Sequence, residues 1–190
     1  MAQAKPRILN DSRDLVWSLI PLLAIALLIA GLAGSCSWGF GTDAGKQVIP
    51  SFDSETALRV DAENMSFPIR EPELPQDWKS NSGSSQPLGS SMMSTVGWIT
   101  PAGAYVQLTQ TGATEDRLVP ALGDQGVLGS GMKEIGGHKW VAYENIEQHN
   151  KIWVTDLGDV RIAVMSRGSD AEMETLAKAI VAAQPLPKRS

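Results

Sequence analysis

The hydrophobic pattern of the chain begins with one long apolar stretch near the N-terminus, from Leu15 to Leu32. The stretch contains no charged residue, and about 20 such residues form a helix that crosses a bilayer core of ~30 Å. Trp17 and Trp38 lie near its two ends, where indole rings favour the membrane–water interfaces. We therefore expect a single transmembrane helix over residues 15–36, and a membrane partner bound through Leu15 to Leu32.

The charges that flank this stretch predict its orientation. Three basic residues precede it, whereas no Lys or Arg follows it before Lys46. Because cytoplasmic flanks carry the Lys/Arg excess, residues 1–14 are expected to form a cytoplasmic tail at the cell membrane. Residues 37–52 would then form a juxtamembrane linker, and residues 53–190 an extracytoplasmic domain. The three basic residues are Lys5, Arg7 and Arg13.

Two other interpretations of the N-terminal stretch stay open. A secretory signal is one, although its apolar region usually has about 7–15 residues and this one is longer. Lipidation at Cys36 is the other, because Ala33-Gly34-Ser35 before it loosely resembles a lipoprotein processing site. Leu32 stands four positions before the cysteine instead of three, so we favour an unmodified Cys36.

Three helices are expected in the C-terminal part. Asp53 or Ser54 can cap a short helix that ends near Asn64, and Thr114 can cap another of about two turns. The clearest helix follows Ser169, which forms a capping box with Glu172. Apolar residues recur along it at helical spacing, and Pro185 and Pro187 end it. They are Met173, Leu176, Ala177, Ile180 and Val181.

Alternating apolar and polar residues predict three β-hairpins. Residues 78–88 are either a flexible loop or an exposed strand, and Phe67-Pro68-Ile69 is a candidate edge strand. The hairpins join 92–100 to 104–110, 130–135 to 138–144 through Gly136-Gly137, and 152–155 to 160–165. The fold class is therefore α+β, with one antiparallel sheet of about six strands packed by helices and preceded by a single transmembrane helix.

Composition excludes several functions. The chain of 190 residues has a formal net charge of −5, and the N-terminal tail is slightly basic, so the C-terminal part is acidic. An acidic domain without a basic stripe is not expected to bind nucleic acid. Cys36 is the only cysteine, which excludes an intramolecular disulfide and a cysteine-rich zinc site.

The sequence contains few candidates for catalysis or metal binding. His138 and His149, with Glu144 and Glu147 nearby, could in principle hold a metal, but their spacing fits no H-x-x-x-H or H-E-x-x-H motif. The serines between Ser80 and Ser94 lack a G-x-S-x-G motif. We therefore assign no catalytic, cofactor-binding or metal-ligating residue, and expect no cofactor.

Two further patterns are better explained by turns than by chemistry. Gly129-Ser130-Gly131 fits a turn or bulge, and Asp156 and Asp159 flank a turn that contains Gly158. Aromatic residues in the predicted strands are expected to pack in the core or on the sheet, with an aromatic ligand groove as the alternative. They are Trp98, Tyr105, Trp140, Tyr143 and Trp153.

Tryptophan, glycine and proline recur through the C-terminal part in a pattern typical of one family. The segments that carry it are Phe67-Pro68-Ile69, Leu74-Pro75-Gln76-Asp77-Trp78, Gly97-Trp98-Ile99-Thr100-Pro101, Tyr105-Val106-Gln107-Leu108, Gly137-His138-Lys139-Trp140, Tyr143 and the closing helix. In these segments the chain resembles an actinobacterial family of single-pass membrane proteins with an extracytoplasmic domain of unknown function. The resemblance implies a single-pass membrane topology with an extracytoplasmic domain, and it assigns no activity to the chain. The order of elements is also similar to the sandwich of photosystem extrinsic proteins and related envelope lipoproteins, a likeness of fold alone.

These observations favour a membrane-anchored extracytoplasmic domain with a non-enzymatic binding or accessory role in the cell envelope. Its partner would be an envelope protein, a lipid or a cell-wall component. The alternative is a small envelope hydrolase or ligand-processing enzyme that uses Ser or Glu from the loops. A pocket with two perturbed titratable groups would favour the enzyme, whereas a shallow patch without them would favour binding.

Overall fold

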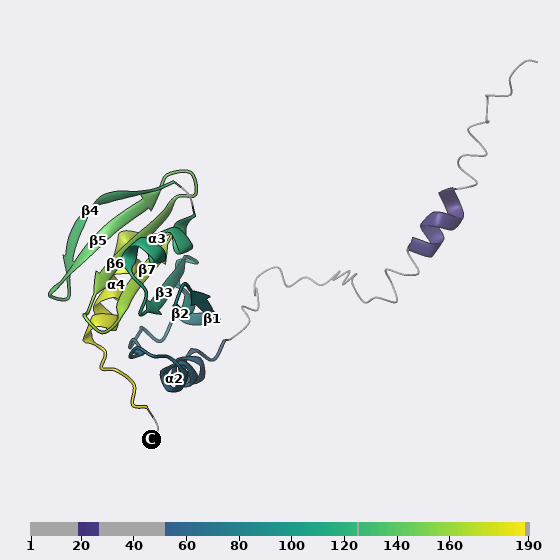
Figure 1. Cartoon of the computed structure of the whole chain (residues 1–190). Coiled ribbons are helices and arrows are strands. Elements are labelled where there is room, and N and C mark those ends of the chain that lie inside the picture. The colour runs from purple at the N-terminus through teal and green to yellow at the C-terminus, as the bar shows by residue number, and fades with distance from the viewer. Residues whose placement is uncertain (1–18, 27–51, 125, 189–190) are drawn as a thin grey trace, which may run out of the picture. The chain divides into compact units, whose positions relative to one another are not determined.

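The computed structural model describes residues 19–26, 52–124 and 126–188 (Figure 1). The chain divides into two compact units, Met1–Gln47 and Val48–Ser190. In the first unit, residues 19–26 are helical. The predicted tail 1–14 and most of the predicted segments 15–36 and 37–52 lie outside the described residues. Within the described part of the chain, no helix has the length and apolar character needed to span a membrane.

The second unit is a seven-stranded antiparallel sheet with three helices, so the α+β prediction is confirmed. The strand count of about six was wrong. The sheet order is β1-β2-β3-β7-β6-β5-β4, which joins a three-stranded meander to a four-stranded one through β3 and β7. The elements are α2 (Ser54–Asn64), β1 (Lys79–Leu88), β2 (Ser91–Ile99), β3 (Tyr105–Thr111), α3 (Glu115–Gly123), β4 (Val127–Ile135), β5 (His138–Asn145), β6 (Asn150–Asp156), β7 (Arg161–Ser166) and α4 (Asp170–Ala182).

Helix caps and tight turns lie largely where the sequence predicts them. Asp53 caps α2 by accepting from the Thr56 backbone N–H, and Ser169 forms the full capping box of α4. Gly136 and Gly137 both have positive φ, which the tight β4–β5 turn requires. Thr114 stands at the N-cap of α3, but its side chain makes no capping hydrogen bond to the backbone.

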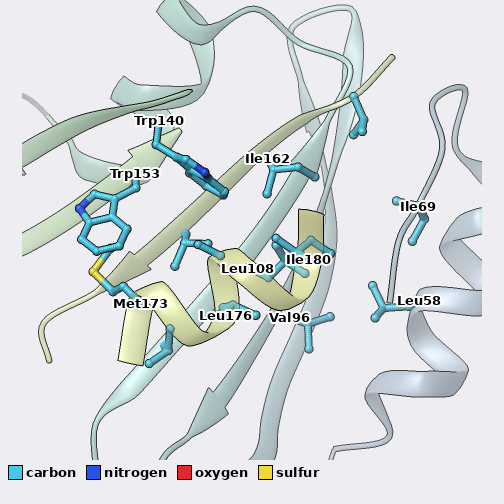
Figure 2. Close-up of a cluster of buried hydrophobic side chains, with 14 of the residues drawn as sticks. Leu58, Ile69, Val96, Leu108, Trp140, Trp153, Ile162, Met173, Leu176 and Ile180 are labelled. Atoms are coloured by element: carbon cyan, nitrogen blue, oxygen red, sulfur yellow. The ribbon is translucent and has the colours of Figure 1, made fainter. Parts of the chain in front are cut away.

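The main core lies between one face of the sheet and helices α4 and α2. Figure 2 shows Leu176 and Ile180 of α4 directed toward Leu108 of β3, with Trp140 and Trp153 at one end of the cluster. Leu176, Leu108 and Trp140 have no exposed surface. Burial of an apolar side chain stabilises the fold by about 1.5–3 kcal/mol, so the α4 stripe holds this helix on the sheet.

A second, smaller core lies on the opposite face of the sheet, under α3. Leu118 and Val119 of α3 pack there with Ile152 and Val154 of β6. Trp153, between those two strand residues, belongs to the main core, because successive side chains of a strand point to opposite faces. Helix α3 therefore covers part of this face as the chain crosses from the interior strand β3 to the edge strand β4.

The extra strand is β1, the serine-rich segment that the sequence left open between a loop and a strand. It pairs with β2 along its whole length and has no second neighbour in the sheet. Two contacts fix it from the α2 side. The Phe52 ring lies over Gly83, where a Cβ would approach within 2.2 Å. Asp61 of α2, which is 8% exposed, accepts from Ser85 (2.6 Å) and Ser94 (2.5 Å).

The predicted edge strand at Phe67-Pro68-Ile69 was wrong. Phe67 and Ile69 are buried in the main core, and the only bridge of this segment joins Arg70 to Pro185. The buried Gln110 side chain takes the place of a strand partner. It accepts from the Arg70 backbone N–H (2.9 Å) and donates to the Arg70 carbonyl (2.8 Å), so the segment is held without a ladder of backbone hydrogen bonds.

Candidate functional site

The face of the sheet that carries α3 remains partly open, and a groove runs over it. One half of the groove, about 380 Å³, lies over β1, β2 and β3 beside α3. The other half, about 420 Å³, lies at the end of β3 and β7. Both halves are lined by Tyr105 and Met165, so they adjoin, and we call them together the open-face groove. The first half is lined by Ser82, Gly83, Ser84, Gln86, Met93, Thr95, Tyr105, Gln107, Ala121, Leu122 and Met165. The second is lined by Gly103, Ala104, Tyr105, Asn150, Met165, Ser166, Arg167 and Gly168.

Tyr105 lies at the centre of the open-face groove and is positioned by a glycine. A Cβ on Gly97 of β2 would meet the Tyr105 hydroxyl oxygen at 2.1 Å and its ring carbons at 2.3 Å. The ring of Tyr105, from β3, therefore lies across Gly97 of the neighbouring strand. Its hydroxyl reaches β1, where it is 3.0 Å from the Ser82 hydroxyl. Only glycine at position 97 permits this placement.

Uncharged polar groups form a continuous network on the floor of the groove. The Gln107 amide donates to the Thr109 hydroxyl at 3.2 Å, and Thr95 and Thr109 are 3.3 Å apart between their hydroxyl oxygens. The Tyr105 hydroxyl also donates weakly to the Gln107 carbonyl oxygen, at 3.4 Å. Because these groups sit on the paired strands β2 and β3, the sheet holds them in place as the floor of the groove.

The second half of the groove ends at the positively charged side chain of Arg167. The Arg167 Nε donates to the Asn150 side-chain oxygen at 2.7 Å, and this arginine is exposed. Among the described residues that line the two halves, Arg167 is the one charged side chain. The lining thus contrasts with the acidic character of the chain as a whole.

The two histidines do not meet in the structure. His138 begins β5 and His149 lies in the turn that follows Asn145, so the length of one strand, roughly 20 Å or more, separates them. His149 is exposed and has a positive φ of 56°. Within the described residues no group of three or more His, Cys, Asp or Glu could hold a metal ion. Neither histidine is among the described residues that line the open-face groove.

The serine-rich segment supplies lining, not an assembled nucleophile. Ser82 and Ser84 face the groove from β1, and their recorded partners are the Tyr105 hydroxyl and the Gln86 amide. Nucleophilic catalysis by serine needs a base within hydrogen-bond reach, and neither partner is a base. Ser85 and Ser94 instead bind Asp61 on the other face of the sheet.

The glycine and aspartate patterns are structural. The pairing of β4 with β5 shifts register between Gly129 and Gly131, so a bulge occupies Gly129-Ser130-Gly131, as the sequence indicates. Asp156 accepts from the Gly158 backbone N–H at 2.8 Å and forms an ion pair with Arg161. Turn geometry therefore accounts for Asp156.

The five strand aromatics divide between the two faces. Trp98, Trp140 and Trp153 are buried in the main core, which confirms core packing for them. Tyr105 and Tyr143 lie on the α3 face, where Tyr143 donates to Glu115 of α3. Burial, followed by that hydrogen bond and the Glu115 charge, raises the pKa of Tyr143 to about 12.

A charged cluster at the N-terminal end of α4 is another polar feature of the domain. Asp170 accepts from Lys151 at 2.7 Å and from Lys133 at 3.0 Å, and these bonds lower the pKa of its carboxyl. The Lys133 ammonium also lies 4.5 Å from the centre of the Trp153 ring. All three charged side chains are more than a third exposed, so the cluster is a solvated ion-pair network that orients α4.

The comparison with family models supports one part of the resemblance, a domain of unknown function. A family model described as "Protein of unknown function (DUF4245)" matches residues 7–180, and the chain belongs to this family. No curated protein and no solved structure matches the chain. The similarity to photosystem extrinsic proteins therefore stays a prediction.

Proposed function

We propose that this DUF4245 chain is a membrane-anchored, extracytoplasmic, non-enzymatic domain that binds a cell-wall component through the open-face groove. The groove is the observation that carries the proposal. It combines a floor of hydroxyl and amide groups with apolar walls from Met93, Leu122 and Met165. Such a mixture of apolar wall and few fixed polar groups is typical of sites that bind small ligands or short polymer segments.

The N-terminal sequence supports the location. The uncharged stretch Leu15 to Leu32 has the length of a membrane span, and the basic residues precede it. A domain placed outside the cytoplasm in this way meets the cell wall. An envelope protein or a lipid remains the competing partner class.

The enzymatic alternative has less support from the groove. A hydrolytic site requires a nucleophile or an activated water beside a general base. The described lining residues of the groove include no Asp, Glu or His, and the Ser82 hydroxyl is paired with the Tyr105 hydroxyl. Binding, in contrast, needs only the preformed surface that these residues make.

Retention by isolated cell walls tests the proposal. The full-length chain, purified in detergent, is mixed with cell walls that have been extracted free of lipid and protein. Ser84 is exposed on β1 and faces the groove, so Ser84→Trp should fill the groove and lower retention at least fivefold. Ser130→Trp is the matched control, because Ser130 is exposed on the far edge strand β4 and should leave retention unchanged.

Two outcomes count against the proposal. If the parent chain is not retained by the extracted walls, a cell-wall partner is wrong. If Ser84→Trp and Ser130→Trp are retained like the parent, the groove is not the binding site.

A further inference from the structure

We infer that the open-face groove holds a neutral pyranose ring, stacked on the face of Tyr105, and is thus a carbohydrate subsite. This inference rests on the proposed function, since it names the chemical class of the cell-wall ligand. It depends on three features of the groove: a flat aromatic surface, paired uncharged hydrogen-bonding groups, and uncharged side chains throughout the described lining of the half over β1, β2 and β3.

The flat surface is the Tyr105 ring. One face of the ring lies against the Gly97 backbone, and the residue lines both halves of the groove. Tyr105 is only partly buried, so some of its ring surface faces the groove. The axial C–H groups of an equatorially substituted pyranose form an apolar face of similar extent, and apolar C–H groups pack favourably on an aromatic face.

The hydrogen-bonding groups surround the ring. Ser82 and the Tyr105 hydroxyl are 3.0 Å apart, and Thr95, Gln107 and Gln86 line the same half of the groove. Each of these hydroxyl and amide groups can both donate and accept. Sugar hydroxyls likewise donate and accept, so neighbouring hydroxyls on one sugar can pair with neighbouring groups on the floor.

Charge favours a neutral sugar. None of the described residues that line the half of the groove over β1, β2 and β3 is charged, and the Arg167 guanidinium belongs to the other half. An ionised ligand group placed in the half over β1, β2 and β3 would lose water without gaining a counter-charge from its lining, which costs several kcal/mol. The volume of about 380 Å³ lies within the range of about 300–1,000 Å³ that is usual for small-ligand sites.

Saturation-transfer NMR tests this directly, because Tyr105 and Tyr143 are the only two tyrosines. The full-length chain is made perdeuterated with protonated tyrosine, in deuterated detergent, and cellotriose and triacetylchitotriose are the probes. Saturation of the tyrosine protons should reach the ring C–H protons of at least one probe. The signal should persist in Tyr143→Phe and vanish in Tyr105→Phe, where the new phenylalanine is deuterated.

Affinity gives an independent readout. Tyr105→Phe keeps the aromatic face, so the dissociation constant of the bound probe should rise by no more than about threefold. Tyr105→Ala removes that face and should raise it by about fivefold to tenfold, as expected for the loss of one aromatic contact.

The outcomes separate the inference from the proposed function. Transfer from Tyr143 alone, or no transfer to either probe, overturns the carbohydrate subsite. If Ser84→Trp still abolishes retention by cell walls in that case, the groove binds a wall component of another class and the proposed function stands. Equal affinity of Tyr105→Ala and the parent for a bound probe also overturns the inference.

Discussion

Asp61→Ala should destabilise the domain because Asp61 ties the serine-rich strand β1 to helix α2. The carboxylate accepts from Ser85 at 2.6 Å and from Ser94 at 2.5 Å, and hydrogen bonds to a charged group contribute about 1.5–3 kcal/mol each. Removal of the carboxylate also removes the cost of burying its charge, which offsets part of the stability lost with these hydrogen bonds. We expect a net loss of about 2 kcal/mol in the free energy of unfolding.

The two serines have different surroundings, and this makes the prediction sharper. Ser94 is 1% exposed, so its hydroxyl finds no water when Asp61 is gone, whereas Ser85 is exposed and can be solvated. The double variant Asp61→Ala/Ser94→Ala should therefore recover stability relative to Asp61→Ala. Asp61→Asn retains one acceptor oxygen and should cost about 1 kcal/mol.

Urea unfolding of the full-length chain, followed by the fluorescence of the buried tryptophans, measures these differences. The reasoning is refuted if Asp61→Ala unfolds within 0.5 kcal/mol of the parent, a margin we set as about half of a typical hydrogen bond. It is also refuted if the double variant is less stable than Asp61→Ala, because the buried, unpaired Ser94 hydroxyl would then not be the source of the loss.

Three further predictions concern the core, the phenol and the topology. Leu176→Ala should cost about 2–5 kcal/mol in urea unfolding, because Leu176 has no exposed surface, while the exposed Lys178→Ala should cost less than about 0.5 kcal/mol. The Tyr143 phenol, followed by ultraviolet absorbance, should ionise near pH 12, and Glu115→Gln should lower the pKa of Tyr143. Because the pKa is higher in the folded chain than in the unfolded one, the protonated phenol stabilises the fold fully below about pH 10. This stabilisation is lost as the pH rises toward 12. Alkaline phosphatase fused after Ser190 should be active, and a stable but inactive fusion would reverse the proposed orientation.

Much of the fold was readable from the sequence wherever a local pattern decided the structure. The Ser169 and Glu172 capping box, the Gly136-Gly137 turn and the alternation in the hairpins each depend on neighbours in the chain. These signals located all three helices of the second unit and six of its seven strands. Only the extent of individual elements shifted, by one to three residues at most ends.

The rest depends on partners distant in sequence, which periodicity does not reveal. Strand β1 lacks an apolar face. Its position at the edge of the sheet follows from its pairing with β2 and from the hydrogen bond that Ser85 donates to Asp61. The segment near Arg70 is held by the side chain of Gln110, 40 positions away. Nothing in the local pattern predicts that β7 inserts beside β3.

The candidate site shows the same limit. The sequence singled out Tyr105 only as one of several strand aromatics and as part of a family segment, and Gly97 only as part of another family segment. The groove arises because the Tyr105 ring lies across Gly97 of the adjacent strand and its hydroxyl reaches Ser82 of the next. A glycine and an aromatic residue on paired strands are the signal that could have indicated it, once the register of β2 against β3 was known.

Photocrosslinking in intact cells tests most directly whether the open-face groove is the binding surface. A benzophenone amino acid is placed either at Gln86, which is exposed and lines the groove, or at Glu174 on α4, on the other side of the sheet. On illumination, the chain labelled at Gln86 should form a covalent product of higher mass, and the chain labelled at Glu174 should not. Equal products from both positions, or a product from Glu174 alone, would contradict the account.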